Sequence, residues 1–153
     1  MLRTCSVLDD EMVRFLHGGC ALIVCTFDAD GDPYASRAWG FTVLCADGEV
    51  RGRLLVTPDV LAEGRIAITA TDVSTLRSLQ LKGRILGVEP MSEADVAKLE
   101  QYTNAFIDDI VRTDQFPRDL VERGRPTELV VCTVLVDELY NQTPGPRAGT
   151  SVA

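Results

Sequence analysis

The 153-residue chain is long enough for one domain with a substantial core and too short for two comfortable ones. Its 46% apolar and 25% charged residues are typical of a globular protein, and its net charge of −8 argues against non-specific binding to nucleic acid or anionic membranes. No stretch approaches the ~20 apolar residues of a membrane span, and the first residues lack the apolar run of a secretory signal. We therefore expect a cytoplasmic protein.

The first half of the chain predicts one helix followed by a run of strands. Ser6, with Asp9 three residues on, is a capping-box-like helix start, and Gly18 with Gly19 closes that helix. His17 falls in its last turn, where we expect it to cap free carbonyl groups rather than to act as a base. Two Asp-Gly turns between β-rich runs then indicate an antiparallel meander. The expected strands are 21–27, 33–45, 49–56, 65–71 and 78–88, with a short helical link at 59–63.

The second half predicts two helices and a final strand. Apolar residues recur on one face of a long helix over 92–112, from Val96 onward. A short helix follows at 118–123, and a Val-rich strand at 128–139. This order is not βαβ alternation, so a Rossmann sheet is not expected. Strands with short turns favour a closed or nearly closed six-stranded barrel, with a sandwich as the alternative.

The chain lacks the motifs of self-sufficient catalysis. Its five cysteines are odd in number and irregularly spaced, and it has one histidine, so neither a disulfide framework nor a Cys/His metal site is expected. No phosphate-binding glycine loop, Walker lysine or GxSxG elbow is present. If the protein is an enzyme, a cofactor should carry the chemistry.

Basic residues gather in the middle of the chain. Residues 37–88 hold seven bases and five acids, whereas the rest of the chain is strongly acidic. A locally basic sheet in an acidic protein suits an anionic small molecule, and scattered solvated charge is the alternative.

The second and fifth strands carry the candidate ligand contacts. Simple alternation places Arg37, Trp39, Phe41 and Val43 on one face of the second strand. An arginine beside an aromatic ring suits a planar anion. On the fifth strand, Gln80, Lys82 and Arg84 point the same way, and a solvent-exposed face is the alternative reading of that pattern.

Several segments resemble one family. Residues 28–37 resemble the DxDGxPxxSR opening of the pyridoxamine-phosphate-oxidase-like FMN-binding split barrels. Residues 61–67 resemble that family's short helix before a strand, 74–83 its strand leading to a Gln-x-Lys-Gly step, and 142–146 one branch's ending. The resemblance runs from about residue 8 to 149. It implies an FMN-binding split-barrel domain over 1–140, with a Pro/Gly-rich C-terminal tail over 141–153.

The resemblance also implies a homodimer with FMN at the subunit interface. The second strand of such proteins lines the flavin ring, and this role falls here on Ser36, Arg37, Trp39 and Gly40. Phosphate ligands would come from the third strand and the segment after it. The strand with the Gln-x-Lys step approaches the flavin from nearby. The corresponding residues are Arg53 and Thr57 for the phosphate, and Arg77, Gln80 and Lys82 near the flavin.

Two departures separate this chain from authentic pyridoxamine-phosphate oxidases. Residues 57–60 contain no base where those enzymes carry a phosphate-binding cluster, and the Arg-Leu-x-Pro ending is absent. Vitamin B6 oxidation is therefore not expected. The first hypothesis is an FMN-dependent oxidoreductase acting on an unknown small molecule. The alternatives are the same fold with F420 or haem, and a ligand-binding protein without turnover.

Overall fold

The computed structural model describes residues 8–60 and 64–152. Ser6 and residues 61–63 of the expected helical link lie outside these ranges. No helix of the described residues is long and apolar enough to cross a membrane. The elements are α1 (Asp10–His17), β1 (Ala21–Phe27), β2 (Pro33–Ala46), β3 (Glu49–Val56), β4 (Gly64–Thr71), β5 (Ser78–Pro90), α2 (Glu93–Asp114), α3 (Arg118–Glu122), β6 (Val130–Asn141) and β7 (Thr150–Ser151).

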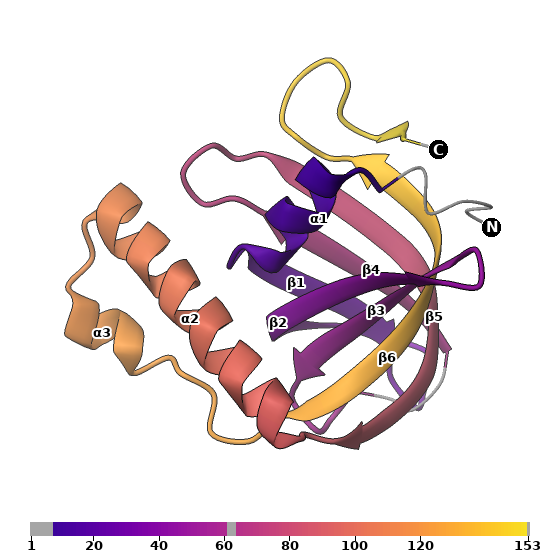
Figure 1. Cartoon of the computed structure of the whole chain (residues 1–153), viewed down its shortest axis with the longest axis horizontal. Coiled ribbons are helices and arrows are strands. Elements are labelled where there is room, and N and C mark those ends of the chain that lie inside the picture. Colours follow the sequence, from indigo (N-terminus) through magenta and orange to yellow (C-terminus); the bar gives the residue numbers. More distant parts are fainter. Residues whose placement is uncertain (1–7, 61–63, 153) are drawn as a thin grey trace.

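The strands form one antiparallel sheet that closes on itself. Its order is β3-β2-β1-β4-β5-β6-β7, and an additional pairing of β3 with β6 completes a ring of six strands (Figure 1). Asp47 and Gly48, both with positive φ, turn β2 into β3, as a two-residue Asp-Gly hairpin requires. The barrel expected from the strand pattern is confirmed, and the short β7 is an addition that the pattern did not predict.

The alternation expected along β2 is broken by a bulge. Between Ala38 and Phe41 the pairing with β3 shifts by one residue. Arg37 and Trp39 therefore remain on the outer face, whereas Phe41 and Val43 turn inward and are 3% and 5% exposed. The prediction that all four side chains share a face is wrong, because one extra residue in a strand reverses the side-chain alternation beyond it.

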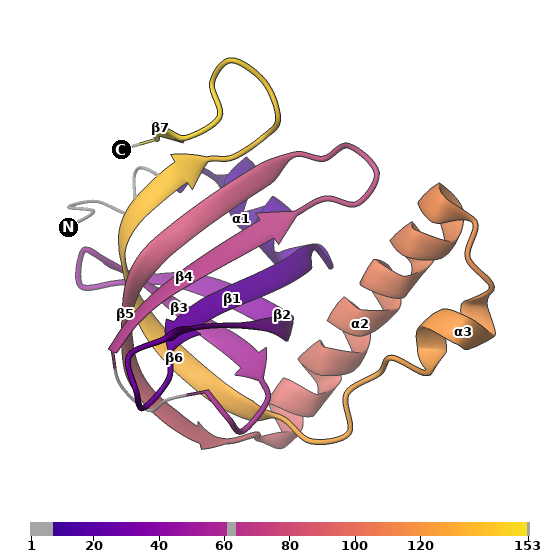
Figure 2. The ribbon, with the colours of Figure 1, turned by 180° about the vertical axis from the view of Figure 1, so that it is seen from behind.

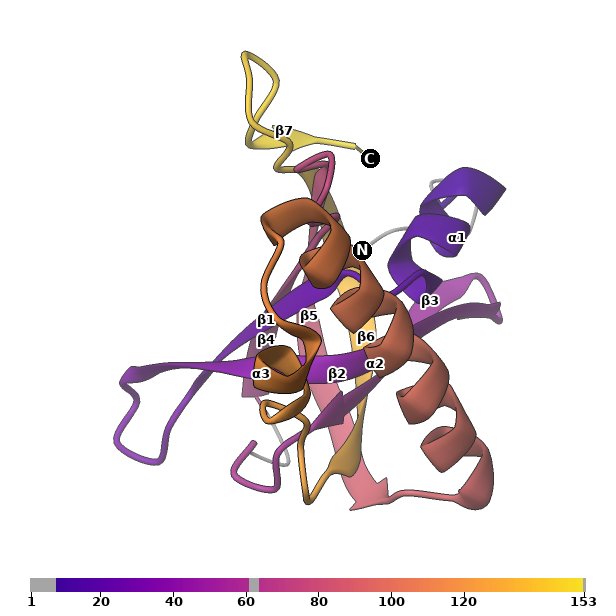
Figure 3. The same cartoon turned by 90° about the vertical axis from the view of Figure 1, so that its left-hand side faces the viewer.

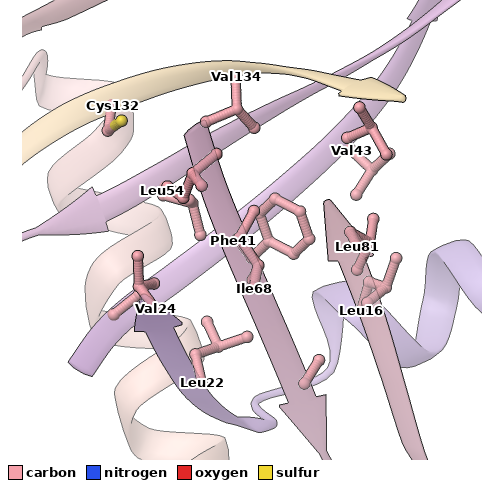
Figure 4. Packing of buried hydrophobic residues seen from close by; sticks show 14 of the residues in the cluster. Leu16, Leu22, Val24, Phe41, Val43, Leu54, Ile68, Leu81, Cys132 and Val134 are labelled. Carbon is pink, nitrogen blue, oxygen red and sulfur yellow. The ribbon is translucent and has the colours of Figure 1, made fainter. Parts of the chain in front are cut away.

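The core fills the inside of the barrel. Leu22, Leu54 and Ile68 come from three different strands and are at most 2% exposed, and Leu16 of α1 joins the same cluster (Figure 4). β5 and β6 approach closely at Gly83, where a Cβ atom would lie 1.8 Å from the Leu135 carbonyl oxygen. Glycine is therefore required at this irregular point of the β5–β6 ladder.

Helix α2 covers part of the outside of the barrel. Its Phe106 and Ile107 are buried, together with Leu55, which the register places on the outer face of β3. The helix begins with a capping box formed by Ser92 and Asp95. Val96, expected on the apolar face, is instead 49% exposed. The first turn of α2 is held by polar contacts of Asp95, so apolar packing begins only further along the helix.

Candidate functional site

The outer face of β1, β4 and β5 is crossed by no helix of the described chain (Figure 2). Strand pairing aligns five side chains of this face in one row, from β2 to β6. The row is Arg37, Ile23, Thr69, Gln80 and Tyr140. We call this surface, together with Trp39 and Lys82 beside the row, the outer sheet face. Strands lie ~4.8 Å apart, so the row places Arg37 about 14 Å from Gln80 along the sheet.

Most bases of the 37–88 segment are neutralised by carboxylates. Arg51, Arg53, Arg65 and Arg77 each form an ion pair. Arg37, Lys82 and Arg84 have no carboxylate of the described residues within 4.0 Å. Two of these three, Arg37 and Lys82, belong to the outer sheet face. Lys82 lies opposite Glu138 in the β5–β6 ladder, where the Tyr140 hydroxyl and the Lys82 ammonium lower the pKa of that carboxyl. Arg37 is therefore the cation of this face with the least compensation by the described carboxylates.

Arg37 and Trp39 both contact Phe106, in the C-terminal half of α2. The guanidinium of Arg37 lies 5.5 Å from the centre of the Phe106 ring. The rings of Trp39 and Phe106 meet edge to face, with centroids 6.3 Å apart. Trp39 is half-buried, whereas Arg37 is exposed. An aromatic wall beside an exposed guanidinium can hold a planar anion through stacking and charge.

Gln80 and Lys82 occupy the opposite side of the same face. Their burial alternates with that of Leu79 and Leu81, as the sequence predicted. The Gln80 side-chain nitrogen donates to the Thr69 hydroxyl at 3.2 Å. The Lys82 ammonium lies 4.7 Å from the centre of the Tyr140 ring. The structure thus brings Arg37, Trp39, Gln80 and Lys82 onto one surface.

Ser36 and Gly40 lie on the same strand but in different surroundings. Ser36 is half-buried and pairs with Val24, a core residue, so it faces the inside of the barrel. Gly40 sits at the β2 bulge, where a Cβ atom would lie 2.8 Å from Leu55 Cδ1. Gly40 therefore leaves room for the Leu55 side chain of β3 beside Trp39.

The remaining three predicted residues bind other protein groups. Arg53 donates to Glu89 at 2.7 Å and to Asp95 at 3.2 Å. The Thr57 hydroxyl donates to Asp59, which also accepts from Tyr34. Arg77 pairs with Glu11 at 2.7 Å and lies over Phe15, so it contacts α1 and not the outer sheet face.

The end of β3 is negatively charged. Hydrogen bonds from the hydroxyl groups of Thr57 and Tyr34 lower the pKa of Asp59 below its usual value. Asp59 is therefore ionised at neutral pH. A carboxylate stands where the resemblance would place a basic phosphate-binding cluster, and it repels an anion.

A pocket of about 200 Å³ lies between α2 and the outer side of β2 and β3. Gly40 and Arg53 of the predicted set line it, together with polar residues that the sequence interpretation missed. The missed residues are His17, Thr42, Asp95, Lys98, Gln101 and Tyr102. Lys98, Gln101 and Tyr102 share one helical face by their spacing. That spacing was visible in the sequence, but the side of α2 that meets the sheet was not.

His17 has a structural role that differs from the expected carbonyl cap. Its Nε2 atom accepts a hydrogen bond from the Val43 backbone N–H at 2.8 Å. β1 pairs with β2 only as far as Ala38, so this N–H has no strand partner on that side. Burial and the Lys98 ammonium lower the pKa of His17 below 6.5. The bond also requires an unprotonated Nε2, so His17 is neutral at pH 7.

This contact predicts a pH dependence of stability. The unfolded chain protonates His17 near pH 6.5, more readily than the folded one. The free energy of unfolding should therefore be unaffected by His17 above pH 6.5 and should fall as the pH is lowered through 6.5 toward the folded-state pKa. Carboxylates with lowered pKa values lose their contribution only below about pH 4. Urea unfolding midpoints at pH 8 and pH 5.5 measure the effect, and His17→Gln should reduce the difference. An equal difference in both proteins would contradict it.

Comparison with known proteins identifies the fold. No protein-family model and no curated protein sequence matches the chain. HupZ from Group A Streptococcus superimposes with a TM-score of 0.52 at 16% identity, covering 92% of this chain and 99% of HupZ. An F420 reductase superimposes with a TM-score of 0.52 at 18% identity, covering 82% of this chain and 92% of that one. A putative pyridoxamine 5'-phosphate oxidase from Lactobacillus delbrueckii gives 0.49 at 18% identity, covering 87% and 93%.

Proposed function

We propose that this chain, which has the split-barrel fold of the pyridoxamine-phosphate-oxidase-like proteins, binds FMN on its outer sheet face and acts as an FMN-dependent oxidoreductase. One observation supports this above others. Arg37 has no carboxylate within 4.0 Å among the described residues and lies where α2 meets the sheet, and Lys82, opposite Glu138, lies on the part of the face that no described helix crosses (Figure 2). Trp39 stands beside Arg37, and Gln80 beside Lys82. Charge, aromatic surface and amide groups are what a planar anionic ring requires.

The described residues suit the ring of FMN. They do not suit its phosphate at the position where the resemblance would place the phosphate-binding cluster. Asp59 makes the end of β3 repulsive to a phosphate. The phosphate would therefore be held by Arg37, Lys82 or Arg84, the bases of the 37–88 segment that form no ion pair within 4.0 Å among the described residues. FMN would supply the transfer of electrons or hydride. Whichever of Arg37 and Lys82 does not hold the phosphate would stabilise negative charge on the ring during that transfer, because a preorganised cation needs no rearrangement when charge develops.

A second copy of the chain would complete the site. Ile23, on the outer sheet face, is 44% exposed, and Phe27 and Tyr34 near the tip of the β1–β2 hairpin are 49% and 38% exposed. This hairpin projects beyond the barrel (Figure 3). A flat face leaves one side of a bound ring in water, and a second copy placed on it would cover both the ring and these apolar side chains. We therefore propose a homodimer with the cofactor at the interface.

The pocket beneath α2 would admit the substrate. Gly40, which follows Trp39 of the proposed ring site along β2, lines it, and Lys98 and His17 give it donors. Asp95 contributes the one carboxylate among its lining residues, and that group is already bonded to Arg53 and Ser92. These groups favour a small anionic substrate over a cationic one.

A deazaflavin is the second candidate. F420 carries a related ring system, and the similar F420 reductase supports this alternative together with the absence of a basic cluster after β3. Histidine-ligated haem has less support, because Nε2 of His17, the one histidine of the chain, already accepts from Val43. A binding protein without turnover would use the outer sheet face alone and would leave the pocket beneath α2 without a role.

Titration of the purified apoprotein with FMN, riboflavin and F420 tests this proposal. Binding should quench the fluorescence of FMN and shift its visible absorption band. Light scattering should give the complex twice the mass of one chain. Riboflavin should bind more weakly, because it lacks the phosphate that the free cations would contact. Tighter binding of F420 than of FMN would favour the deazaflavin. Absence of binding by all three would contradict the proposal.

A further inference from the structure

The segment after β6 is folded onto the sheet. The backbone N–H of Gln142 donates to the Ser78 carbonyl at 2.8 Å, and the Thr143 hydroxyl accepts from the Ser78 N–H at 3.0 Å. The N–H of Gly149 then donates to the Asn141 carbonyl at 2.7 Å, which brings the chain back to pair with β6 as β7. These bonds hold Gln142 at the margin of the outer sheet face independently of its own side chain.

The Gln142 side chain begins a line of hydrogen bonds on that face. Its Nε2 donates to Gln80 Oε1 at 3.3 Å, and Gln80 Nε2 donates to Thr69 Oγ1 at 3.2 Å. All three side chains are half-buried. The Thr69 hydroxyl, which accepts from Gln80, keeps its own hydrogen free to donate outward. The line extends from the C-terminal segment through β5 to β4.

We propose that Gln142 is a positioning residue for the ligand of the outer sheet face, a role that rests on the proposed function. The Gln142 side chain donates to the Gln80 side-chain carbonyl and so fixes the orientation of the Gln80 amide. This orientation determines which polar groups of Gln80 and Thr69 can bind a ligand. Gln80 and Thr69 then offer donors and acceptors side by side. This order suits a heterocycle edge on which carbonyl and N–H groups alternate, as in the imide edge shared by flavins and deazaflavins. Haem has no such edge.

A double-mutant cycle tests this role. Gln142→Leu and Gln80→Leu should each weaken FMN binding roughly five- to tenfold, the range expected for one lost hydrogen bond and its consequences. Because Gln142 acts through Gln80, the double variant should bind no more weakly than Gln80→Leu alone. Arg147→Ala, an exposed change in the same segment, should leave the affinity unchanged. Since the backbone of Gln142 makes the anchoring bond, Gln142→Leu should unfold at the same temperature as the wild type.

A second probe tests the imide edge directly. Riboflavin should bind the wild-type protein more tightly than 3-methylriboflavin, in which the imide N–H is blocked, and this difference should shrink in Gln142→Leu. The visible band of bound flavin should shift in the same variant. Additive losses in the cycle, or an unchanged preference between the two flavins, would overturn the role of Gln142 while leaving flavin binding intact. Failure of the wild-type protein to bind any of FMN, riboflavin and F420 would instead overturn the proposed function, and this role with it.

Discussion

Replacing Arg37 with alanine should weaken FMN binding by about 1.5–3 kcal/mol, a loss of roughly ten- to a hundredfold in affinity. The guanidinium is exposed and has no carboxylate partner among the described residues, so its charge is available to the ligand. In the folded chain it contacts the Phe106 ring at 5.5 Å, an interaction of about 0.5–1 kcal/mol at an exposed site. The loss should therefore fall on binding, with little change in the melting temperature.

Two further variants separate charge from geometry at Arg37. Arg37→Lys keeps the charge but not the planar fork, so it should restore part of the affinity. Arg123→Ala removes another exposed arginine, at the end of α3, and should change neither affinity nor melting temperature. Fluorescence titration and thermal unfolding of each variant provide both measurements. An unchanged FMN affinity with a clear fall in melting temperature would make Arg37 a scaffold residue.

Replacing Ile23 with glutamate should separate the proposed dimer into monomers. Ile23 lies in the middle of the outer sheet face, between Arg37 and Thr69, and is 44% exposed. In the proposed dimer this position becomes buried, and removing a carboxylate from water costs several kcal/mol, which pairing with Arg37 on the neighbouring strand would offset only in part. In a monomer the same side chain stays in water and should cost little. FMN affinity should fall together with the dimer, because the second copy would cover the ring.

Light scattering at micromolar concentration measures this effect. Leu120→Glu is the matched control, since Leu120 is 52% exposed on α3 and lies away from the outer sheet face. That variant should remain dimeric and should bind FMN as the wild type does. A dimer that survives Ile23→Glu would move the interface to another surface. A dimer that survives while FMN binding is lost would place Ile23 in the ligand site alone.

The strands were predictable because local patterns determine them. β1 and β3 have the expected bounds, β2, β4 and β5 differ by one or two residues at one end, and β6 is shifted by two residues at both ends. Asp-Gly turns and β-rich runs act over a few residues, so a single sequence contains the information. The bulge after Ala38 was not predictable in the same way. It depends on which residue of β3 faces each residue of β2, and alternation along one strand does not contain that register.

For the candidate site, too, part of the information was local to the sequence and part depended on the tertiary structure. Sequence alone indicated a split barrel, a basic central segment, and Arg37, Trp39, Gln80 and Lys82 as residues of one ligand surface. It could not show that carboxylates from distant parts of the chain neutralise Arg53 and Arg77, because Asp95 and Glu11 approach them only after folding. It could not show that Gln142 reaches Gln80 across 62 positions of the chain. Residue types and turns are local properties of the sequence. Which charged side chains lack a partner depends on the closed sheet and on the helix packed against it, because these bring distant parts of the chain together.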